Sequence, residues 1–279
     1  MIPPIARRFL AGESVPEALE HARVCNEDGL AVILNLLGEH YDDPAAVRAD
    51  VDAYLALLDD VADSELDACI SVKPSQIGLD ISPDLFEEQY REIVARAHEL
   101  DAFVWCDMEA ADTTDATLDA FESIAEAYPW SVGQCLQSNL KRTRDDLERL
   151  VDVPGMIRLV KGAYDEPAAI AYTDKTDVDA AYREGLRFLF EHRTRGVAVG
   201  SHDPAMIALA DRLARKHGTD YEVQLLMGVR EAAQRDLAAQ GVDVHQYAPY
   251  GDKWLSYFYR RLRERKENLT FAARAITGR

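Results

Sequence analysis

The sequence predicts an α/β protein with a (β/α)8 TIM-type barrel, and three observations support this fold class. Short apolar runs alternate with amphipathic stretches eight times along the chain. The runs are rich in Val, Ile, Leu and aromatic residues, which is typical of parallel strands buried on both faces. No linker rich in Pro, Gly or Ser divides the 279 residues. A strand followed by a helix, repeated eight times, favours a closed barrel over an open sheet.

Each apolar run marks one expected strand. In chain order the strands are expected at residues 30–37, 68–72, 103–108, 131–136, 156–160, 197–200, 222–227 and 242–247. Apolar residues at helical spacing follow from four starting points, which are Pro83, Thr114, Asp177 and Pro204. Residues 1–29 are expected to form an extra helix that covers the bottom or edge of the barrel, and residues 30–279 the barrel itself.

The formal net charge of −19 argues against nucleic acid or an anionic membrane as a principal partner, because such a field repels both. Most of the basic residues are Arg and few are Lys. An acidic surface short of Lys suits a protein that stays hydrated in concentrated salt, where self-repulsion is screened. We therefore expect adaptation to a salt-rich cytoplasm, with an ordinary acidic enzyme as the alternative.

The sequence also gives an expectation for where the protein is located. The N-terminus lacks the apolar core of a signal peptide, and no apolar run approaches the roughly 20 residues that cross a bilayer. A cytoplasmic protein is expected, with contact to the inner membrane face left open.

The four cysteines are far apart and form no CxxC or CxxH pair. They are expected to be core residues, and no disulfide or metal site is expected.

Polar residues follow nearly every expected strand. In a barrel of this type the active site is built at the carboxyl ends of the strands. The groups delivered to that rim are Glu39 and His40, Lys73, Asp107 and Glu109, Gln137, Arg158 with the turn Lys161-Gly162-Ala163, Ser201 and His202, and Tyr247. A purely structural protein has little reason for such a rim.

These residues also have plainer interpretations. Lys73 fits a solvated loop and Asp107 a helix cap, although Lys73 directly follows an apolar run. Arg158 lies between apolar neighbours and needs a buried partner, which favours a site. The small residues after Lys161 let backbone N–H groups approach a phosphate. However, the turn is not a Walker A sequence, and no GxGxxG follows the first strand. Any nucleotide is therefore expected in the barrel loops.

The segment 253–267 is expected to be a helix with aromatic and cationic faces. Arg260 and Arg261 are adjacent, and Glu264 lies near both on a helix. A solvated face is the usual meaning of such charges. Two guanidinium groups can also hold a small carboxylate through paired hydrogen bonds, so an anion clamp is the other interpretation.

A series of short motifs occurs along the chain in a fixed order. They are Leu37-Gly38-Glu39, Ser71-Val72-Lys73-Pro74-Ser75, Asp107-Met108-Glu109, Gln137 ahead of Arg142, Arg158-Leu159-Val160-Lys161-Gly162-Ala163-Tyr164, Ser201-His202-Asp203, Gln224-Leu225-Leu226-Met227-Gly228, Tyr247-Ala248-Pro249-Tyr250-Gly251 and Arg260-Arg261-Leu262-Arg263-Glu264. Together they resemble the proline dehydrogenase family over roughly residues 10–271. The resemblance implies a distorted barrel that binds FAD across the strand ends and oxidises L-proline to Δ1-pyrroline-5-carboxylate.

The resemblance also implies a role for each matched position. Binding of the proline carboxylate falls to Lys73, Arg260 and Arg261, alignment of the arginines to Glu264, and packing on the substrate ring to Tyr247. Asp107 and Arg158 are the implied catalytic pair. The implied FAD contacts are Met108, Gln137, Arg158, Lys161, Gly162, Ala163, Ser201 and His202. The implied partners are a quinone-type electron acceptor and a pyrroline-5-carboxylate dehydrogenase that takes the product.

The chain departs from the family pattern at a few positions. Ser201 stands where Thr is usual, and His245-Gln246 where Arg-Val is commoner. None of these changes removes a group that the chemistry needs. Removing hydride from a ring carbon requires an acceptor that no side chain provides, so a flavin fits.

Two other functions remain open from the residues alone. In a Schiff-base lyase or aldolase on the same barrel, Lys161 or Lys73 is the nucleophile. Flavin absorbance in the purified protein separates that function from a dehydrogenase. In a non-catalytic metabolite-binding barrel, proline binds without reducing a dye.

Overall fold

Eight parallel strands close into a barrel in chain order, with β1 paired to both β2 and β8. The protein is represented by a computed structural model in which residues 6–254 are described; residues 1–5 and 255–279 lie outside the described part. The strands are β1 (Ala31–Leu36), β2 (Ala68–Val72), β3 (Val104–Cys106), β4 (Val132–Gln137), β5 (Met156–Val160), β6 (Val197–Gly200), β7 (Tyr221–Leu226) and β8 (Asp243–Tyr250). The predicted (β/α)8 barrel is confirmed, and every predicted strand overlaps an observed one.

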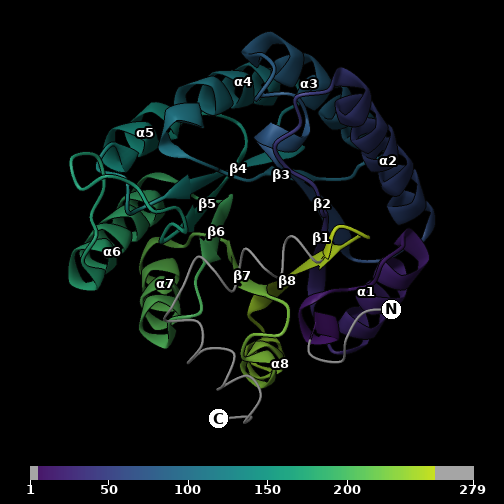
Figure 1. The fold of residues 1–279 in the computed structure, drawn as a ribbon. Coiled ribbons are helices and arrows are strands. Elements are labelled where there is room, and N and C mark those ends of the chain that lie inside the picture. Colours follow the sequence, from purple (N-terminus) through teal and green to yellow (C-terminus); the bar gives the residue numbers. More distant parts are fainter. Residues whose placement is uncertain (1–5, 255–279) are drawn as a thin grey trace.

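The helices form a ring around the barrel (Figure 1). They are α1 (Val15–Glu27), α2 (Pro44–Asp63), α3 (Pro83–Glu99), α4 (Thr114–Ala127), α5 (Thr143–Leu150), α6 (Lys175–His192), α7 (Pro204–His217) and α8 (Glu231–Ala239). Short 3-10 turns lie at Ala6–Phe9, Pro74–Gln76 and Ala111–Thr113. Each of α2 to α8 connects one strand to the next, so all strands run in the same direction.

Three helices begin with the same local signal. Asp43, Ser82 and Asp203 each precede a proline at the first helical position of α2, α3 and α7. In each case the side-chain oxygen accepts a hydrogen bond from a backbone N–H of the first turn. The proline has no N–H to leave unpaired and its fixed φ suits a helix, so these starts follow directly from the sequence.

The helix α1 precedes β1 and packs against β1 and β8. In Figure 1 it lies in the ring between α8 and α2. In an ideal barrel this place belongs to a helix that follows β8. The predicted N-terminal extra helix is confirmed by α1, which lies within the ring of helices.

Two apolar layers hold the barrel. An outer cluster joins the helices to the outward faces of the strands, and an inner cluster of Ile33, Cys69, Trp105 and Ala198 fills the barrel interior. The alternation is plain on β6, where Val197 and Val199 belong to the outer cluster and Ala198 to the inner one. All four cysteines are buried and free, as predicted. None of the helices within residues 6–254 has the length and apolar composition that spanning a bilayer requires.

Two strand ends differ from the predicted ones by more than one residue. The strand β3 ends at Cys106, so Asp107 and Met108 lie in the loop that follows it. The strand β8 continues to Tyr250, and its last residues pair with the end of β1. Both differences concern the carboxyl ends of strands, where the polar residues of the rim begin.

Candidate active site

A cavity of about 700 Å³ opens at the carboxyl ends of the strands. Its walls come from β2 to β8 and the loops that follow them. The cavity brings together most of the residues predicted from sequence, namely Lys73, Asp107, Met108, Gln137, Arg158, Lys161, Gly162, Ala163, His202 and Tyr247. These residues therefore line one chamber at the strand ends, as the active-site rule for barrels predicts.

The carboxylate of Asp107 is the centre of the polar contacts in this chamber. Its Oδ2 accepts hydrogen bonds from Lys73 Nζ at 2.6 Å and from the Tyr247 hydroxyl at 2.7 Å. Its Oδ1 accepts from Ser71 Oγ at 2.9 Å and from a guanidinium nitrogen of Arg158. The four donors thus come from three strands, with Ser71 and Lys73 at the end of β2, Arg158 on β5 and Tyr247 on β8, and all the contacts lie in the protein interior.

Charge pairing outweighs burial in this cluster. Burial opposes ionisation of Asp107, but the charges of Lys73 and Arg158 hold the pKa of the carboxyl well below its usual range. Burial also opposes the ammonium of Lys73, yet the charge of Asp107 raises the pKa of the lysine well above its ordinary value. Two cations therefore share one anion, and the cluster carries an excess positive charge.

Arg158 is held on several sides. Its guanidinium carbon lies 4.9 Å from the centroid of the Trp105 ring and 5.7 Å from that of Tyr247. Its Nη1 donates to Gln224 Oε1 at 3.1 Å. The residue is only 4% exposed, and its buried Nε has no hydrogen-bond partner among residues 6–254. The prediction that Arg158 needs a buried partner is confirmed by its ion pair with Asp107.

A short turn after β5 is tied to β4 through Gln137. The side chain of Gln137 donates to the carbonyl of Glu109 at 2.7 Å and accepts from the backbone N–H of Ala163 at 3.4 Å. Gly162 has φ of 102°, a conformation that favours glycine. A Cβ at Gly162 would lie 2.0 Å from Asn139 Oδ1. This position therefore requires a residue without a side chain.

Lys161 lines the cavity but is bound by two acids. Its Nζ lies 2.9 Å from Asp203 Oδ2 and also pairs with Asp179. Ser201 is not part of the cavity wall, and its Oγ accepts a hydrogen bond from the backbone of Asp203. The cause is strand alternation, because Gly200 and His202 face the cavity and Ser201 points the other way.

His202 is a half-buried neutral histidine at the cavity wall. Its Nε2 accepts a hydrogen bond from the backbone N–H of Leu226 at 3.3 Å, so the proton belongs on Nδ1. That Nδ1 is buried and has no partner within the described residues. Burial, followed by the charge of Arg230, lowers the pKa of His202 to about 4. The imidazole therefore offers an unused N–H donor.

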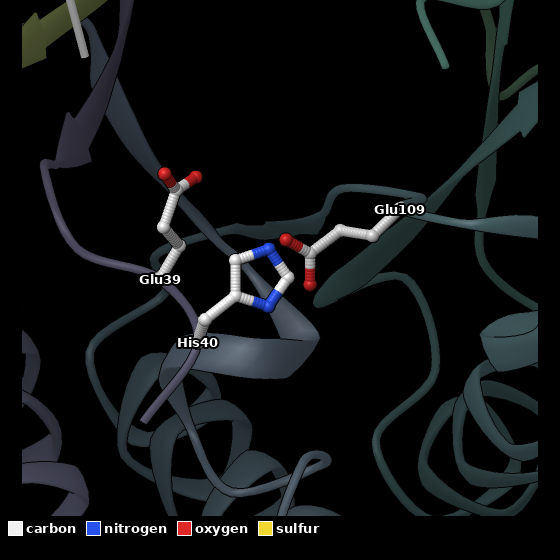
Figure 2. Close-up of side chains that lie close together, drawn as sticks. All are labelled: Glu39, His40 and Glu109. Atoms are coloured by element: carbon white, nitrogen blue, oxygen red, sulfur yellow. The ribbon is translucent and has the colours of Figure 1, made fainter. Parts of the chain in front are cut away.

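A second group of polar side chains lies at the rim beyond β1. Figure 2 shows the imidazole of His40 between the carboxyl groups of Glu39 and Glu109. Glu109 accepts hydrogen bonds from the backbone N–H and the hydroxyl of Ser75, at 2.7 and 2.8 Å. His40 Nδ1 lies 2.8 Å from Asp80 Oδ2. These contacts connect the loops after β1, β2 and β3.

Three of the predicted site residues, Arg260, Arg261 and Glu264, lie outside the described residues. The anion clamp that they suggest stays a prediction.

The sequence interpretation gave no role to Ser71, Trp105 and Gln224, which contact Asp107 or Arg158. A signal for each was present in the alternation of strand residues. Ser71 is two positions before Lys73, Trp105 two before Asp107, and Gln224 lies in a matched motif. Residues two apart on a strand share a face, so the neighbours of a predicted site residue on that face are themselves candidates.

Comparison with known proteins agrees with this site. A family model described as proline dehydrogenase matches residues 18–274. A proline dehydrogenase of Deinococcus radiodurans is 37% identical, with 98% of this chain and 90% of that protein covered. Proline dehydrogenase 2 of Bacillus subtilis is 34% identical, with the same coverage of 98% and 90%.

A solved structure is similar in fold. Proline utilization A from Bdellovibrio bacteriovorus matches with a TM-score of 0.85 and 23% identity, over 94% of this chain. The match covers 33% of that larger protein, so this chain spans about a third of its length. The sequence matches, together with the buried cluster at the strand ends, identify the chain. It belongs to the proline dehydrogenase family and is an oxidoreductase that acts on proline.

Proposed function

We propose that the cavity at the strand ends oxidises L-proline to Δ1-pyrroline-5-carboxylate with FAD as its cofactor. The observation that carries this proposal is the cluster around Asp107, where Lys73 and Arg158 share one carboxylate. The excess positive charge suits a substrate that brings a carboxylate. The cluster lies at the wall of a cavity large enough for both a cofactor and a small substrate.

Membership of the family implies a flavin, and the residues around the cavity fit one. His202 presents a buried N–H donor and Arg158 a buried Nε, and neither has a partner in the described part of the chain. The cavity of about 700 Å³ lies within the roughly 300–1,000 Å³ of small-molecule sites. We propose that FAD is held by Met108, Gln137, Arg158, Lys161, Gly162, Ala163 and His202, and that Ser201, which lies behind the cavity wall, supports this site through its hydrogen bond with Asp203.

When bound, FAD supplies the hydride acceptor that amino-acid side chains lack. The protein holds proline in one orientation and excludes water from it. We propose that Lys73, with Arg260 and Arg261, binds the proline carboxylate, while Glu264 aligns the two arginines. Tyr247 packs against the ring, its hydroxyl fixed by Asp107.

The substrate's nitrogen sets the expected pH dependence. As the neighbouring C–H bond is lost, the ring nitrogen donates its lone pair to form the C=N bond. A protonated ring nitrogen has no lone pair to donate, so only the free amine reacts. Activity is therefore expected to rise with pH until that amine is fully deprotonated.

The Schiff-base alternative is disfavoured by the state of Lys73. A lysine nucleophile must be a free amine, and such lysines are found where the pKa is lowered. Here Asp107 outweighs the effect of burial and raises the pKa of Lys73. The ammonium therefore acts as a cation in this site.

The proposed reaction implies two partners outside the chain. Electrons must leave the reduced cofactor, and a quinone-type acceptor is the partner that we propose. The product is an imine of a cyclic amino acid, and we propose that a pyrroline-5-carboxylate dehydrogenase consumes it.

The test is a proline-dependent dye-reduction assay with the absorption spectrum of the protein recorded. Denaturation should release about one equivalent of FAD per chain. Lys73→Met should lose most of its kcat/KM for proline, while Lys216→Met, at an exposed position of α7, should keep it. An active, folded preparation that contains FMN or no flavin would contradict the proposal.

A further inference from the structure

A chain of polar side chains continues from the active site through the interior of the barrel. Arg158 Nη1 donates to Gln224 Oε1 at 3.1 Å, and Gln224 Nε2 donates to the carboxylate of Glu222. The other oxygen of Glu222 lies 3.2 Å from His245 Nε2. The same nitrogen lies 3.2 Å from Asp243 Oδ1, at the start of β8. The chain thus runs from the cavity to the opposite end of the barrel.

Most of this polar chain is shielded from solvent. Gln224 and Glu222 are 5% and 7% exposed, and the side chain of His245 is 15% exposed. Only Asp243, with its side chain 63% exposed, reaches the surface. A carboxylate buried as deeply as Glu222 is unfavourable unless a cation and hydrogen bonds compensate it. His245 and Gln224 provide that compensation.

The charges of the pair follow from their surroundings. Burial disfavours the imidazolium of His245, but hydrogen bonds to Asp243 and Cys69 and the charge of Glu222 raise its pKa to about 11. Burial raises the pKa of Glu222, while His245, Gln224 and Arg158 oppose that rise. Cys69 on β2 also faces His245, and burial raises the pKa of its thiol, which stays neutral. Glu222 and His245 are therefore an ion pair at neutral pH.

The ion pair fixes the direction of the Gln224 amide. A carboxylate accepts hydrogen bonds, so the NH2 group of Gln224 turns toward Glu222. The carbonyl oxygen of Gln224 then faces Arg158, which can only donate. A neutral Glu222 would accept this hydrogen bond more weakly and could also donate one, so it would hold the amide of Gln224 less firmly.

We propose that Gln224, Glu222 and His245 are positioning residues for proline oxidation. Gln224 binds one nitrogen of the Arg158 guanidinium and is itself held by Glu222 and His245, while Asp107 binds another nitrogen of the same group. This inference rests on the proposed function, because it concerns the arginine of that active site.

Stability alone does not account for the polar chain. Replacing a buried ion pair by apolar side chains of similar size is often neutral or stabilising. The rest of the inner cluster shows that apolar residues fill this barrel well. A polar chain that ends on Arg158 instead fits a role in placing that side chain.

The first test compares two buried strand glutamines. Gln224→Leu should lower kcat/KM for proline by about 10-fold or more, because small displacements of a catalytic group are costly. The matched control is Gln246→Leu, since Gln246 is 3% exposed but bonds to His21 and Gln234 on the outer side of the barrel. Flavin content and thermal midpoint are measured for both. Equal kcat/KM in the two variants would overturn the proposal.

The second test uses the charge of Glu222. In His245→Gln the carboxyl loses its counter-ion, so its pKa rises further and it becomes protonated as the pH falls. The ratio of kcat/KM in this variant to wild type should then fall as the pH drops through the pKa of Glu222, and level off about 10-fold lower once Glu222 is protonated. His245→Arg, with a cation that does not titrate, should keep the ratio constant.

The fall of the kcat/KM ratio at low pH should be absent in the double variant Glu222→Gln with His245→Gln. That result would assign the pH dependence of His245→Gln to the carboxyl group of Glu222. Glu222→Gln alone keeps the shape of the side chain and should lower kcat/KM at every pH; it also serves if Gln224→Leu does not fold. A constant ratio in His245→Gln would contradict the proposal.

Arg158→Met separates this inference from the proposed function. If Arg158→Met keeps wild-type proline oxidation, the assigned active site is wrong. If Arg158→Met abolishes activity while the Gln224 and His245 variants behave as wild type, only the positioning role is wrong.

Discussion

The ammonium of Lys73 lies 2.6 Å from the carboxylate of Asp107, and both side chains are less than 15% exposed. The two residues directly follow the adjacent strands β2 and β3 and are 34 positions apart in sequence. Because Arg158 binds the other carboxylate oxygen, Asp107 neutralises only one of the two cations around it. The site therefore has charge left for a substrate carboxylate, and this balance makes Asp107 the residue to change first.

We expect Asp107→Ala to lower the free energy of unfolding by about 3–5 kcal/mol, because it leaves two buried cations without their shared anion. The control is Asp211→Ala, which removes an exposed pair with Arg215 and should cost no more than about 1 kcal/mol. Chemical denaturation of both variants measures the difference. Equal effects would mean that the buried cluster adjusts without its carboxylate.

We expect Gly162→Ala to weaken flavin binding by roughly tenfold or more, since a strained backbone costs about 1–3 kcal/mol and the new Cβ meets Asn139 at 2.0 Å. The turn must move to relieve that contact, and its backbone lies against the cavity. Gly218→Ala is the control, because Gly218 also has a positive φ but no atom within 4 Å of the added Cβ. Flavin content after gel filtration gives the answer; full retention in Gly162→Ala would exclude the turn from cofactor binding.

The depressed pKa of His202 predicts how stability depends on pH. Its pKa is lowered from 6.5 to about 4, so between these values the unfolded chain binds the proton and the folded chain does not. The contribution of His202 is present above pH 6.5 and is lost as the pH falls toward 4. It should amount to roughly 3 kcal/mol, because each pKa unit corresponds to about 1.4 kcal/mol. Unfolding free energies of wild type and His202→Gln across this range should show a shallower slope in the variant, and parallel curves would disprove the assignment.

Much of the fold could be predicted because strand and helix periods are written directly into the sequence. Val197, Ala198 and Val199 read as a buried strand, and Pro204 as a helix start, without any knowledge of contacts between them. The place of α1 could not be read in this way. An amphipathic helix indicates that one face is buried, while its position against β1 and β8 depends on where the whole ring leaves a gap.

The part of the site that lies at the strand ends could be predicted from the sequence, because these ends meet at one rim of the barrel. Lys73 and Arg158 are distant in sequence, and only the barrel rule brings them together. The hydrogen bonds behind Arg158 were missed because glutamine and histidine on a strand give no distinctive pattern. Ser201 matches a family motif but does not line the cavity, because a motif match does not show which face of the strand a residue occupies.

The net charge of −19 predicts that stability and activity both rise toward molar KCl. Salt shortens the screening length to about 3 Å at 1 M, which relieves repulsion among the unpaired acids. The same salt weakens surface ion pairs such as Arg48 with Glu92, but each of these contributes at most about 1 kcal/mol. Thermal midpoints and dye-reduction rates, measured from low salt to about 2 M KCl, show whether stability and activity rise or fall with salt. A flat or falling curve would show an ordinary acidic enzyme.

The proposed carboxylate clamp is tested at Arg261. Proline is small, so much of its specific binding must come from its carboxylate, and charge-assisted hydrogen bonds contribute about 1.5–3 kcal/mol each. Arg261→Met keeps an apolar stem but removes the donors, so kcat/KM should fall roughly 10- to 100-fold while flavin content stays unchanged. Arg261→Lys should rescue only part of this, because an ammonium cannot make the planar two-point contact.

The matched control for the clamp is Arg215→Met, since Arg215 is exposed on α7 and pairs only with Asp211 among the described residues. The same measurements are made on Arg260→Met, because two guanidinium groups that share one carboxylate should each be needed. Steady-state kinetics on proline and flavin occupancy are measured for every variant. Wild-type kcat/KM in both the Arg260 and Arg261 variants would mean that these arginines belong to a solvated helix face, and that Lys73 with Arg158 supplies the charge that proline requires.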